Sequence, residues 1–219
     1  HRVKYVSVTN GNAGHHKRGP NELAFIRENE AKRAASALGA EYECLGVNDG
    51  HVWVNEENMR LIVKVIREFS PDLLITHRTN DYHRDHRYTS QLIMDASYML
   101  IVPLYCPEFP PKTRDMPIIA YAYDNFKKPS IFQTDVILNL SDLFTKKVAA
   151  VSNHESQLFE WLPWTMKMEN VINEETDREK RMDLAGMIIN NQFGSITERY
   201  MPLLKELFPG QECVSFEAY

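Results

Sequence analysis

One stretch of the sequence concentrates side chains that bind metals and move protons. Residues 76–86 hold three histidines and two aspartates: His77, Asp81, His83, Asp85 and His86. Neutral imidazole is a common ligand for zinc and other divalent metals, and a carboxylate can complete the ligand set or orient an imidazole. His83 and His86 lie three residues apart, so both can line one small cavity. One would bind a metal while the other exchanges a proton, with Asp85 bracing an imidazole. A polar surface loop with solvated histidines is the alternative.

Other histidines offer further candidates. His154 is the best single candidate for another site residue, and its alternative is an ordinary histidine at a helix end. His15 and His16 follow the first expected strand and would share the carboxyl edge of the sheet with His83, although solvation in that loop is the simpler interpretation. The sequence contains no HExxH, GxSxG, P-loop or GxGxxG pattern. These absences give no support to a zincin, an α/β-hydrolase nucleophile or a nucleotide-phosphate loop.

The elements around these residues alternate between strand and helix. Apolar patterns predict strands at 1–9, 41–45 and 72–76, and helices at 21–38 and 56–69. This order indicates a parallel sheet with helices on both sides. The strand at 72–76 is nearly all apolar, so we expect it to be buried on both faces. Ligands of open α/β sheets bind beyond the carboxyl ends of the strands, which is where the histidine-rich stretch lies.

The second half of the chain is less regular. A helix is expected at 87–100, and the five prolines between Pro103 and Pro117 predict an irregular excursion that could form part of a pocket rim. Further strands are expected at 118–123 and 135–140, and helices at 142–158 and 177–207, the last of them broken near Pro202. No linker divides the chain, so residues 1–219 are expected to form one domain.

Composition excludes several classes of protein. The chain has 219 residues, 43% hydrophobic and 25% charged, which is typical of a globular domain rather than a disordered tail or collagenous repeat. No apolar run is long enough to cross a bilayer. The net charge of −5 argues against nonspecific nucleic-acid binding. Cys44, Cys106 and Cys213 are too few and too far apart for a disulfide framework, and we interpret them as small hydrophobic residues.

The ordered motifs resemble one known family. The chain is similar to the LmbE-like, or PIG-L-type, zinc-dependent N-deacetylases, which have a Rossmann-like fold. The segments that carry this resemblance are Val8–Gly14, Ile26–Ala31, the HxDH pattern within Asn80–His86, His154–Gln157 and the tail Phe216–Tyr219. Together they span nearly the whole chain in the family's order. The resemblance implies a Rossmann-like three-layer sandwich, an α/β fold whose mostly parallel sheet is flanked by helices.

The resemblance also implies roles for individual residues. His86 would be a metal ligand, and His83 would stabilise the tetrahedral intermediate or protonate the leaving amine. Asp85 would orient His83. The substrate-binding positions would be Arg27, Asp49 and His154. The family's usual proline between the first histidine and the aspartate is Arg84 in this chain.

One family motif is absent from the sequence. The Ala-His-Pro-Asp-Asp motif, which in the family supplies a histidine and an aspartate to the metal and another aspartate as general base, would lie upstream of His1. We therefore expect the natural chain to carry a further N-terminal strand and helix, because a central strand that is missing leaves its neighbours' backbone groups unpaired. A truncated, metal-free remnant is the alternative. An export signal, if the natural chain has one, would also lie upstream.

Two functions follow as expectations. The first is a zinc-dependent hydrolase, or one using another divalent metal, that removes an N-acetyl or other acyl group from an N-acetylglucosamine-type amino sugar or its conjugate. The second is a non-catalytic module that binds a glycan or nucleotide on the same fold. The expected partner is a small amino-sugar substrate, with no nucleic acid and no transmembrane segment, and a homo-oligomer is compatible with the sequence. Metal content of the purified protein distinguishes the two functions.

Overall fold

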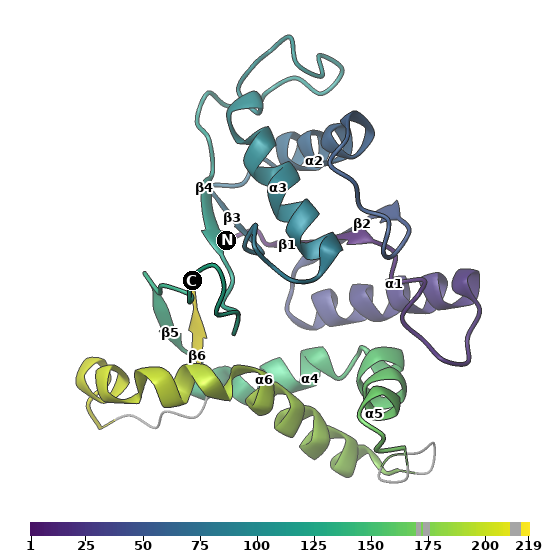
Figure 1. The fold of residues 1–219 in the computed structure, drawn as a ribbon, viewed down its shortest axis with the longest axis vertical. Coiled ribbons are helices and arrows are strands. Elements are labelled where there is room, and N and C mark those ends of the chain that lie inside the picture. The colour runs from purple at the N-terminus through teal and green to yellow at the C-terminus, as the bar shows by residue number, and fades with distance from the viewer. Residues whose placement is uncertain (170–171, 173–175, 211–215) are drawn as a thin grey trace.

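The computed structural model describes residues 1–169, 172, 176–210 and 216–219 (Figure 1). The first half of the chain alternates strands and helices. Its elements are β1 (Lys4–Thr9), α1 (Pro20–Ala37), β2 (Glu41–Val47), α2 (Glu56–Phe69), β3 (Leu73–Thr76), α3 (Arg84–Met99) and β4 (Ile118–Tyr121). The second half is mostly helical. Its elements are β5 (Ile137–Asn139), the 3₁₀ turn Ser141–Leu143, α4 (Phe144–Val151), a π-helical segment Ser156–Trp161, α5 (Leu162–Thr165), α6 (Arg178–Leu207) and β6 (Phe216–Ala218).

The strands form pairs. β1 pairs with β2 and β3 pairs with β4, both in parallel, while β5 and β6 are antiparallel. Among the described residues no ladder joins β1 to β3. The predicted α/β class is therefore confirmed, whereas the mostly parallel sheet is present as two separate parallel pairs.

Helices α2 and α3 form the layer on which both parallel pairs rest. Their buried side chains make one apolar cluster that contacts Val8 and Val47 from the first pair and Leu74 and Ile119 from the second. Helix α1 contacts β2 and α4 and lies on the other side of the strands from α2 and α3 (Figure 1). Helices therefore lie on both sides of the β1–β2 pair, as the alternating pattern predicts.

Strand β3 differs from its prediction. Leu74 packs against the α2 and α3 cluster, but Leu73 is 53% exposed and Ile75 is 48% exposed. Successive side chains of a strand point to opposite faces, so Leu73 and Ile75 face away from the helices. The expectation that β3 is buried on both faces is wrong, because only one of its faces is covered.

The two helices that position the site begin in different ways. The prediction of a helix over 56–69 is confirmed, and the side chain of Asn55 caps it by accepting from the Asn58 N–H at 2.9 Å. Helix α3 begins three residues before its predicted start, with His83 at the N-cap. Asp85 and His86 therefore lie in its first turn.

Arg67 on α2 organises the proline-rich excursion. Its buried guanidinium donates to six backbone carbonyls around the end of α3, those of Met99, Leu100, Val102, Tyr105, Cys106 and Phe109. This places the excursion at the C-terminal end of α3, whereas His83 and His86 lie at the start of that helix (Figure 1). The expectation that Pro103–Pro117 rims the site is therefore wrong.

The C-terminal helices pack on one another. Val148 of α4, Leu158 and Phe159 of the π-helical segment, and Ala185 and Ile189 of α6 form a second apolar cluster. Helix α6 continues through Pro202 to Leu207, so the predicted break does not occur. The proline removes one internal hydrogen bond, that to the carbonyl four residues earlier, and the helix continues beyond it.

Two further expectations concern membranes and cysteines. Among the residues that the structure describes, no helix combines the length and apolar character needed to cross a bilayer. Cys44 is half-buried and Cys106 is buried, and both are free thiols. Cys213 lies outside the described residues.

Candidate functional site

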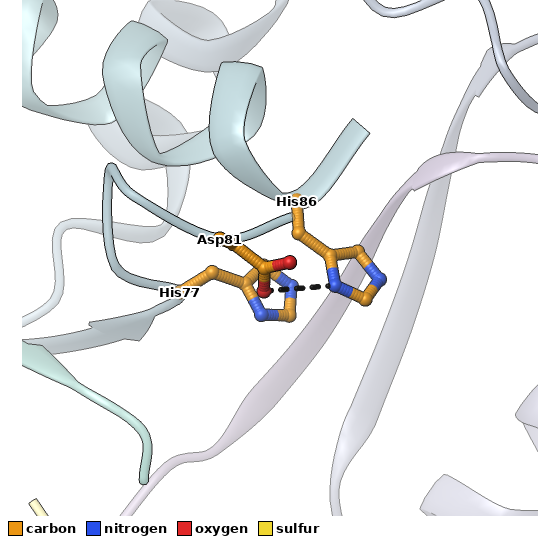
Figure 2. Close-up of side chains that lie close together, drawn as sticks. All are labelled: His77, Asp81 and His86. Carbon is orange, nitrogen blue, oxygen red and sulfur yellow. Dashed lines mark hydrogen bonds and ion pairs between the residues drawn. The ribbon is translucent and has the colours of Figure 1, made fainter. Parts of the chain in front are cut away.

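Three side chains behind β3 converge on one point. Each of His77, Asp81 and His86 offers a ligand atom, and these atoms lie within 4.8 Å of one another (Figure 2). His77 directly follows the last residue of β3, Asp81 lies in the loop, and His86 lies in the first turn of α3. The His77 and His86 rings stack with their centroids 4.1 Å apart. The end of a strand and the start of a helix therefore bring two imidazoles and one carboxylate together.

The carboxylate of Asp81 connects the members of this group. Asp81 is only 5% exposed. Its Oδ2 lies 3.1 Å from His86 Nδ1 (Figure 2), and its Oδ1 accepts from the His83 backbone N–H at 2.7 Å. The contact between Asp81 Oδ2 and His86 Nδ1 orients the His86 ring, and the other ring nitrogen, Nε2, points away from Asp81. Asp81 also fixes the turn that precedes α3.

The neutral state of the His77 imidazole suits a metal ligand. Burial, together with the nearby His86 and His83 rings, lowers the pKa of His77 to about 4. His77 is therefore neutral at neutral pH, with a lone pair on one ring nitrogen. Two imidazoles and a carboxylate form a donor set that suits zinc, iron(II) and manganese(II). The residues present thus fit a divalent metal.

His83 lies beside this group without belonging to it. Its ring centroid is 4.5 Å from that of His86, with the planes tilted by 33°. The ring also contacts the edge of Tyr82. His83 is exposed. It can therefore reach a substrate that approaches from solvent.

Asp85 has partners other than the one expected. Its carboxylate accepts from the backbone N–H groups of Gly50 at 2.6 Å and Val52 at 3.2 Å, and it is 4% exposed. Both oxygens are thus bonded to the loop between β2 and α2 rather than to His83. The guanidinium of Arg84 stacks 3.5 Å above the ring of Trp53 in the same loop. These contacts tie the start of α3 to the loop that carries Asp49.

Arg27 and Asp49 meet around Gly14. A β-carbon placed on Gly14 would lie 3.9 Å from Arg27 Nη2, from Asp49 Oδ2 and from Trp161 Nε1. Arg27 also donates to the carbonyl of Gly14 at 3.0 Å and to the side chain of Gln157. Burial lowers the pKa of the Arg27 guanidinium, which the charges of Glu30 and Asp49 oppose. The predicted substrate-binding residues Arg27 and Asp49 are thus brought together.

His154 lies at the entrance to the π-helical segment. Burial lowers its pKa, and the positive charges of Arg27 and Arg33 lower it further. The segment is held by Glu30, whose buried carboxylate accepts from the backbone N–H and the hydroxyl of Ser156, both at 2.7 Å. His154 is therefore near Arg27 and is neutral at neutral pH.

The group of His77, Asp81 and His86, called the histidine group below, is separate from the Arg27–Asp49 pair in the structure. The described residues show no hydrogen bond between the two sets. The sets are linked through Asp85, which accepts from the backbone N–H of Gly50, the residue after Asp49. Two cavities lie elsewhere, of about 350 Å³ and about 760 Å³, and both are lined chiefly by the C-terminal helical segments. Neither cavity is lined by a member of the histidine group.

Sequence reasoning did not assign roles to His77, Asp81 or Trp161. His77 and Asp81 belong to the histidine-rich stretch, and the position of His77 immediately after an apolar strand is a usable signal. Trp161 gave no such signal, because its place beside Gly14 depends on a contact between residues far apart in the chain.

Comparison with known proteins confirms the predicted family resemblance. Residues 1–97 match the family model for PIG-L, described as GlcNAc-PI de-N-acetylase. This stretch contains His77, Asp81, His83 and His86 as well as Arg27 and Asp49. The matched part therefore includes both sets of site residues other than His154 and Trp161.

Individual relatives include both deacetylases and a hydratase. The chain is 25% identical over 141 residues to 4-oxalmesaconate hydratase of Pseudomonas putida KT2440, and it spans 54% of that protein's length. The crystal structure of GalB, the 4-carboxy-2-hydroxymuconate hydratase of the same organism, has a TM-score of 0.70 and 16% identity, covering 99% of this chain and 82% of that one. N,N'-diacetylchitobiose deacetylase from Pyrococcus horikoshii has a TM-score of 0.66 and 21% identity, covering 89% and 68%.

Proposed function

We propose that this chain is a metal-dependent hydrolase that removes an N-acetyl or other acyl group from an N-acetylglucosamine-type amino sugar or its conjugate. The observation that carries the proposal is the convergence of His77, Asp81 and His86 within a stretch that matches the GlcNAc-PI de-N-acetylase family model. We place this activity in one Rossmann-like domain formed by residues 1–219. A homo-oligomer is compatible with this proposal.

The metal would be held by the histidine group. His86 and His77 would supply imidazole nitrogens, and Asp81 would supply a carboxylate oxygen or orient His86 from behind. Zinc is the metal we expect, with another divalent ion as the alternative. When bound, such an ion polarises an acyl carbonyl and lowers the pKa of a coordinated water.

The other residues would bind the substrate and move protons. His83, exposed beside His86, would stabilise the oxyanion or give a proton to the departing amine nitrogen. Asp85 would position His83 indirectly, because it fixes the first turn of α3 against residues 50–52. Arg27, Asp49 and His154 would bind sugar hydroxyls.

Metal loading and acetate release test this proposal together. The protein would be stripped with a chelator, reloaded with zinc and incubated with N-acetylglucosamine and with N,N'-diacetylchitobiose. We expect about one zinc per chain and equal release of acetate and free amine. His77→Ala and His86→Ala should lose both, while His1→Ala, at an exposed histidine outside the group, should keep both. Turnover that survives complete metal removal would overturn the assignment.

Hydration is the second candidate function. It is favoured by the 25% identity to 4-oxalmesaconate hydratase over 141 residues. Such a reaction adds water across a carbon–carbon double bond and releases no acetate. Incubation with 4-oxalmesaconate, followed by loss of the ultraviolet absorbance of its conjugated system, would detect it. A metal-free protein that binds sugar without turnover would instead support the binding module.

A further inference from the structure

Arg78 directly follows His77 and reaches into the loop after β4. Its Nε donates to Asp124 Oδ2 at 2.7 Å, and its Nη2 donates to Asp124 Oδ1. The two side chains are only 10% and 13% exposed. A buried guanidinium that bonds to both oxygens of one carboxylate has a fixed position and direction. The residue beside one member of the histidine group is therefore anchored in a second loop.

The same guanidinium holds the backbone of that second loop, residues 124–130, called the β4 loop below. It donates to the carbonyl oxygens of Phe126 at 3.2 Å and Ser130 at 3.1 Å. Asp124 Oδ1 also accepts from the Phe126 N–H at 2.9 Å. The β4 loop is therefore folded around Arg78.

Two more contacts join the β4 loop to the residues on either side of Asp81. Asn80 Nδ2 donates to the carbonyl of Lys128 at 3.1 Å. The rings of Tyr82 and Phe126 meet edge to face, with centroids 5.1 Å apart and an interplanar angle of 82°. Asp81 is thus carried by a segment whose residues on both sides contact the β4 loop.

Helix α3 holds the other side of the same segment. The Ser90 hydroxyl donates to the carbonyl of His77 at 2.5 Å, and Arg87 donates to the carbonyl of Asp81 at 2.8 Å. His86, the third member of the histidine group, belongs to α3 itself. The positions of His77 and Asp81 relative to His86 therefore depend on how residues 77–82 fit between α3 and the β4 loop.

We propose that Arg78 and Asp124 are positioning residues for the histidine group. Their ion pair docks residues 77–82 on the β4 loop and so fixes where His77 and Asp81 lie relative to His86. This inference rests on the proposed function where it concerns a metal, because the positioned side chains are those that would hold it. Coupling between two sites is reciprocal, so a metal bound by the group must stabilise the β4 loop by the same factor as the ion pair strengthens metal binding.

Amide hydrogen exchange of the metal-free protein tests the positioning role directly. The N–H groups of Asp81 and His83 report on the segment, because they donate to the Arg78 carbonyl and to Asp81 Oδ1. Arg78→Lys keeps the charge but loses the planar fork, and should speed the exchange of both amides about 10-fold while the amides of α2 keep their rates. Arg60→Lys, at an exposed arginine that pairs with Glu108, is the matched control and should leave the Asp81 and His83 rates unchanged.

Zinc affinity supplies the second measurement. Arg78→Lys and Asp124→Asn should each weaken zinc binding about 10-fold or more in a competitive titration, as loss of groups that orient metal ligands does. Zinc should in turn slow the exchange of the Phe126 N–H in the wild type, and slow it less in Arg78→Lys. Should Asp124→Asn fail to fold, the double variant Arg78→Met/Asp124→Leu removes both charges together and serves in its place.

The two measurements separate this inference from the proposed function. If the wild type binds no zinc, faster exchange at Asp81 and His83 alone in the variants would support the positioning role and overturn the metal-dependent hydrolase. Unchanged exchange at these two amides would overturn the positioning role whatever the zinc affinity. Equal and measurable zinc affinity in the wild type and the variants, or acceleration of α2 exchange by the same factor, would overturn it and leave the hydrolase standing.

Discussion

Asp81 contacts His86 through one carboxylate oxygen and the His83 backbone through the other. Replacement by Asn keeps the size of the side chain but removes its charge. Because partners that orient a ligating histidine contribute to metal binding, we expect Asp81→Asn to weaken zinc binding about 10- to 100-fold. Competitive titration with a chromogenic chelator measures this change.

Asp95→Asn is a suitable control for this substitution. Asp95 lies on α3 and is exposed, and among the described residues its carboxylate accepts only from the side chain of Gln91. Equal zinc affinity in Asp81→Asn and the wild type would show that Asp81 serves only to shape the turn before α3.

His154 makes the stability of the folded protein depend on pH. Its pKa is lowered in the folded protein by burial and by Arg27 and Arg33, so the unfolded chain binds protons more readily once the pH falls below about 6.5. This contribution is fully present above that pH and is lost as the pH falls toward the folded pKa. We expect His154→Gln to have a flatter dependence of Tm on pH between 8 and 5 than the wild type. Parallel curves for the two proteins would contradict this account.

Residue types alone selected the stretch of sequence that holds the candidate group of His77, Asp81 and His86. His83, Asp85 and His86 could be selected because metal-binding side chains cluster after an apolar strand. The partners of each residue could not be predicted. Asp85 bonds to backbone groups of residues 50–52, and Asp81 is the carboxylate that orients a histidine, His86. Such pairings depend on how the turn places each carboxylate relative to backbone N–H groups of other elements.

At the level of elements, Arg67 holds the end of α3 to the excursion that follows it. Arg67 is 4% exposed, and its guanidinium bonds only to carbonyl oxygens in the residues described. Arg67→Met would leave several buried carbonyls without a donor. We expect it to lower the free energy of unfolding by about 3–5 kcal/mol, measured by urea denaturation.

Arg60→Met provides the comparison on the same helix. Arg60 is 45% exposed and pairs with Glu108 at the surface. Its loss should change the free energy of unfolding by less than about 1 kcal/mol. A similar loss in both variants would mean that the carbonyl contacts of Arg67 contribute little.

Elements with strong local signals were predicted well. Helix α2 has its cap, its apolar face and its terminating serine in the sequence, and its bounds are those expected. The π-helical segment Ser156–Trp161 begins where the end of an ordinary helix over 142–158 was expected, and it continues beyond that bound. Its position depends on Glu30, a buried contact more than a hundred residues away, which local periodicity does not encode.

At the scale of the whole molecule, the two parallel pairs remain apart. The sequence pattern predicted the order and the parallel direction of the strands in the first half of the chain, and it predicted helices beside them. It did not predict β6 or its antiparallel pairing with β5. The strand pattern alone did not specify that β1 and β3 would each have a ladder partner on one side only among the residues described, although the family motif absent from the sequence implied unpaired neighbours of a central strand. Pairing between strands is a long-range property that alternating patterns do not specify.

The open flank of β3 has a consequence for handling the protein in solution. Among the described residues β3 has a ladder partner on one side only, and its half-exposed Leu73 and Ile75 form an apolar strip beside which other extended peptides can pair. We expect light scattering to rise with protein concentration, and Ile75→Lys to reduce it without lowering Tm. Unchanged scattering in Ile75→Lys would exclude this strip as the source. Reduced scattering in Ile75→Lys would instead mean that a single short strand, rather than the net charge of the chain, sets the colloidal behaviour of the sample.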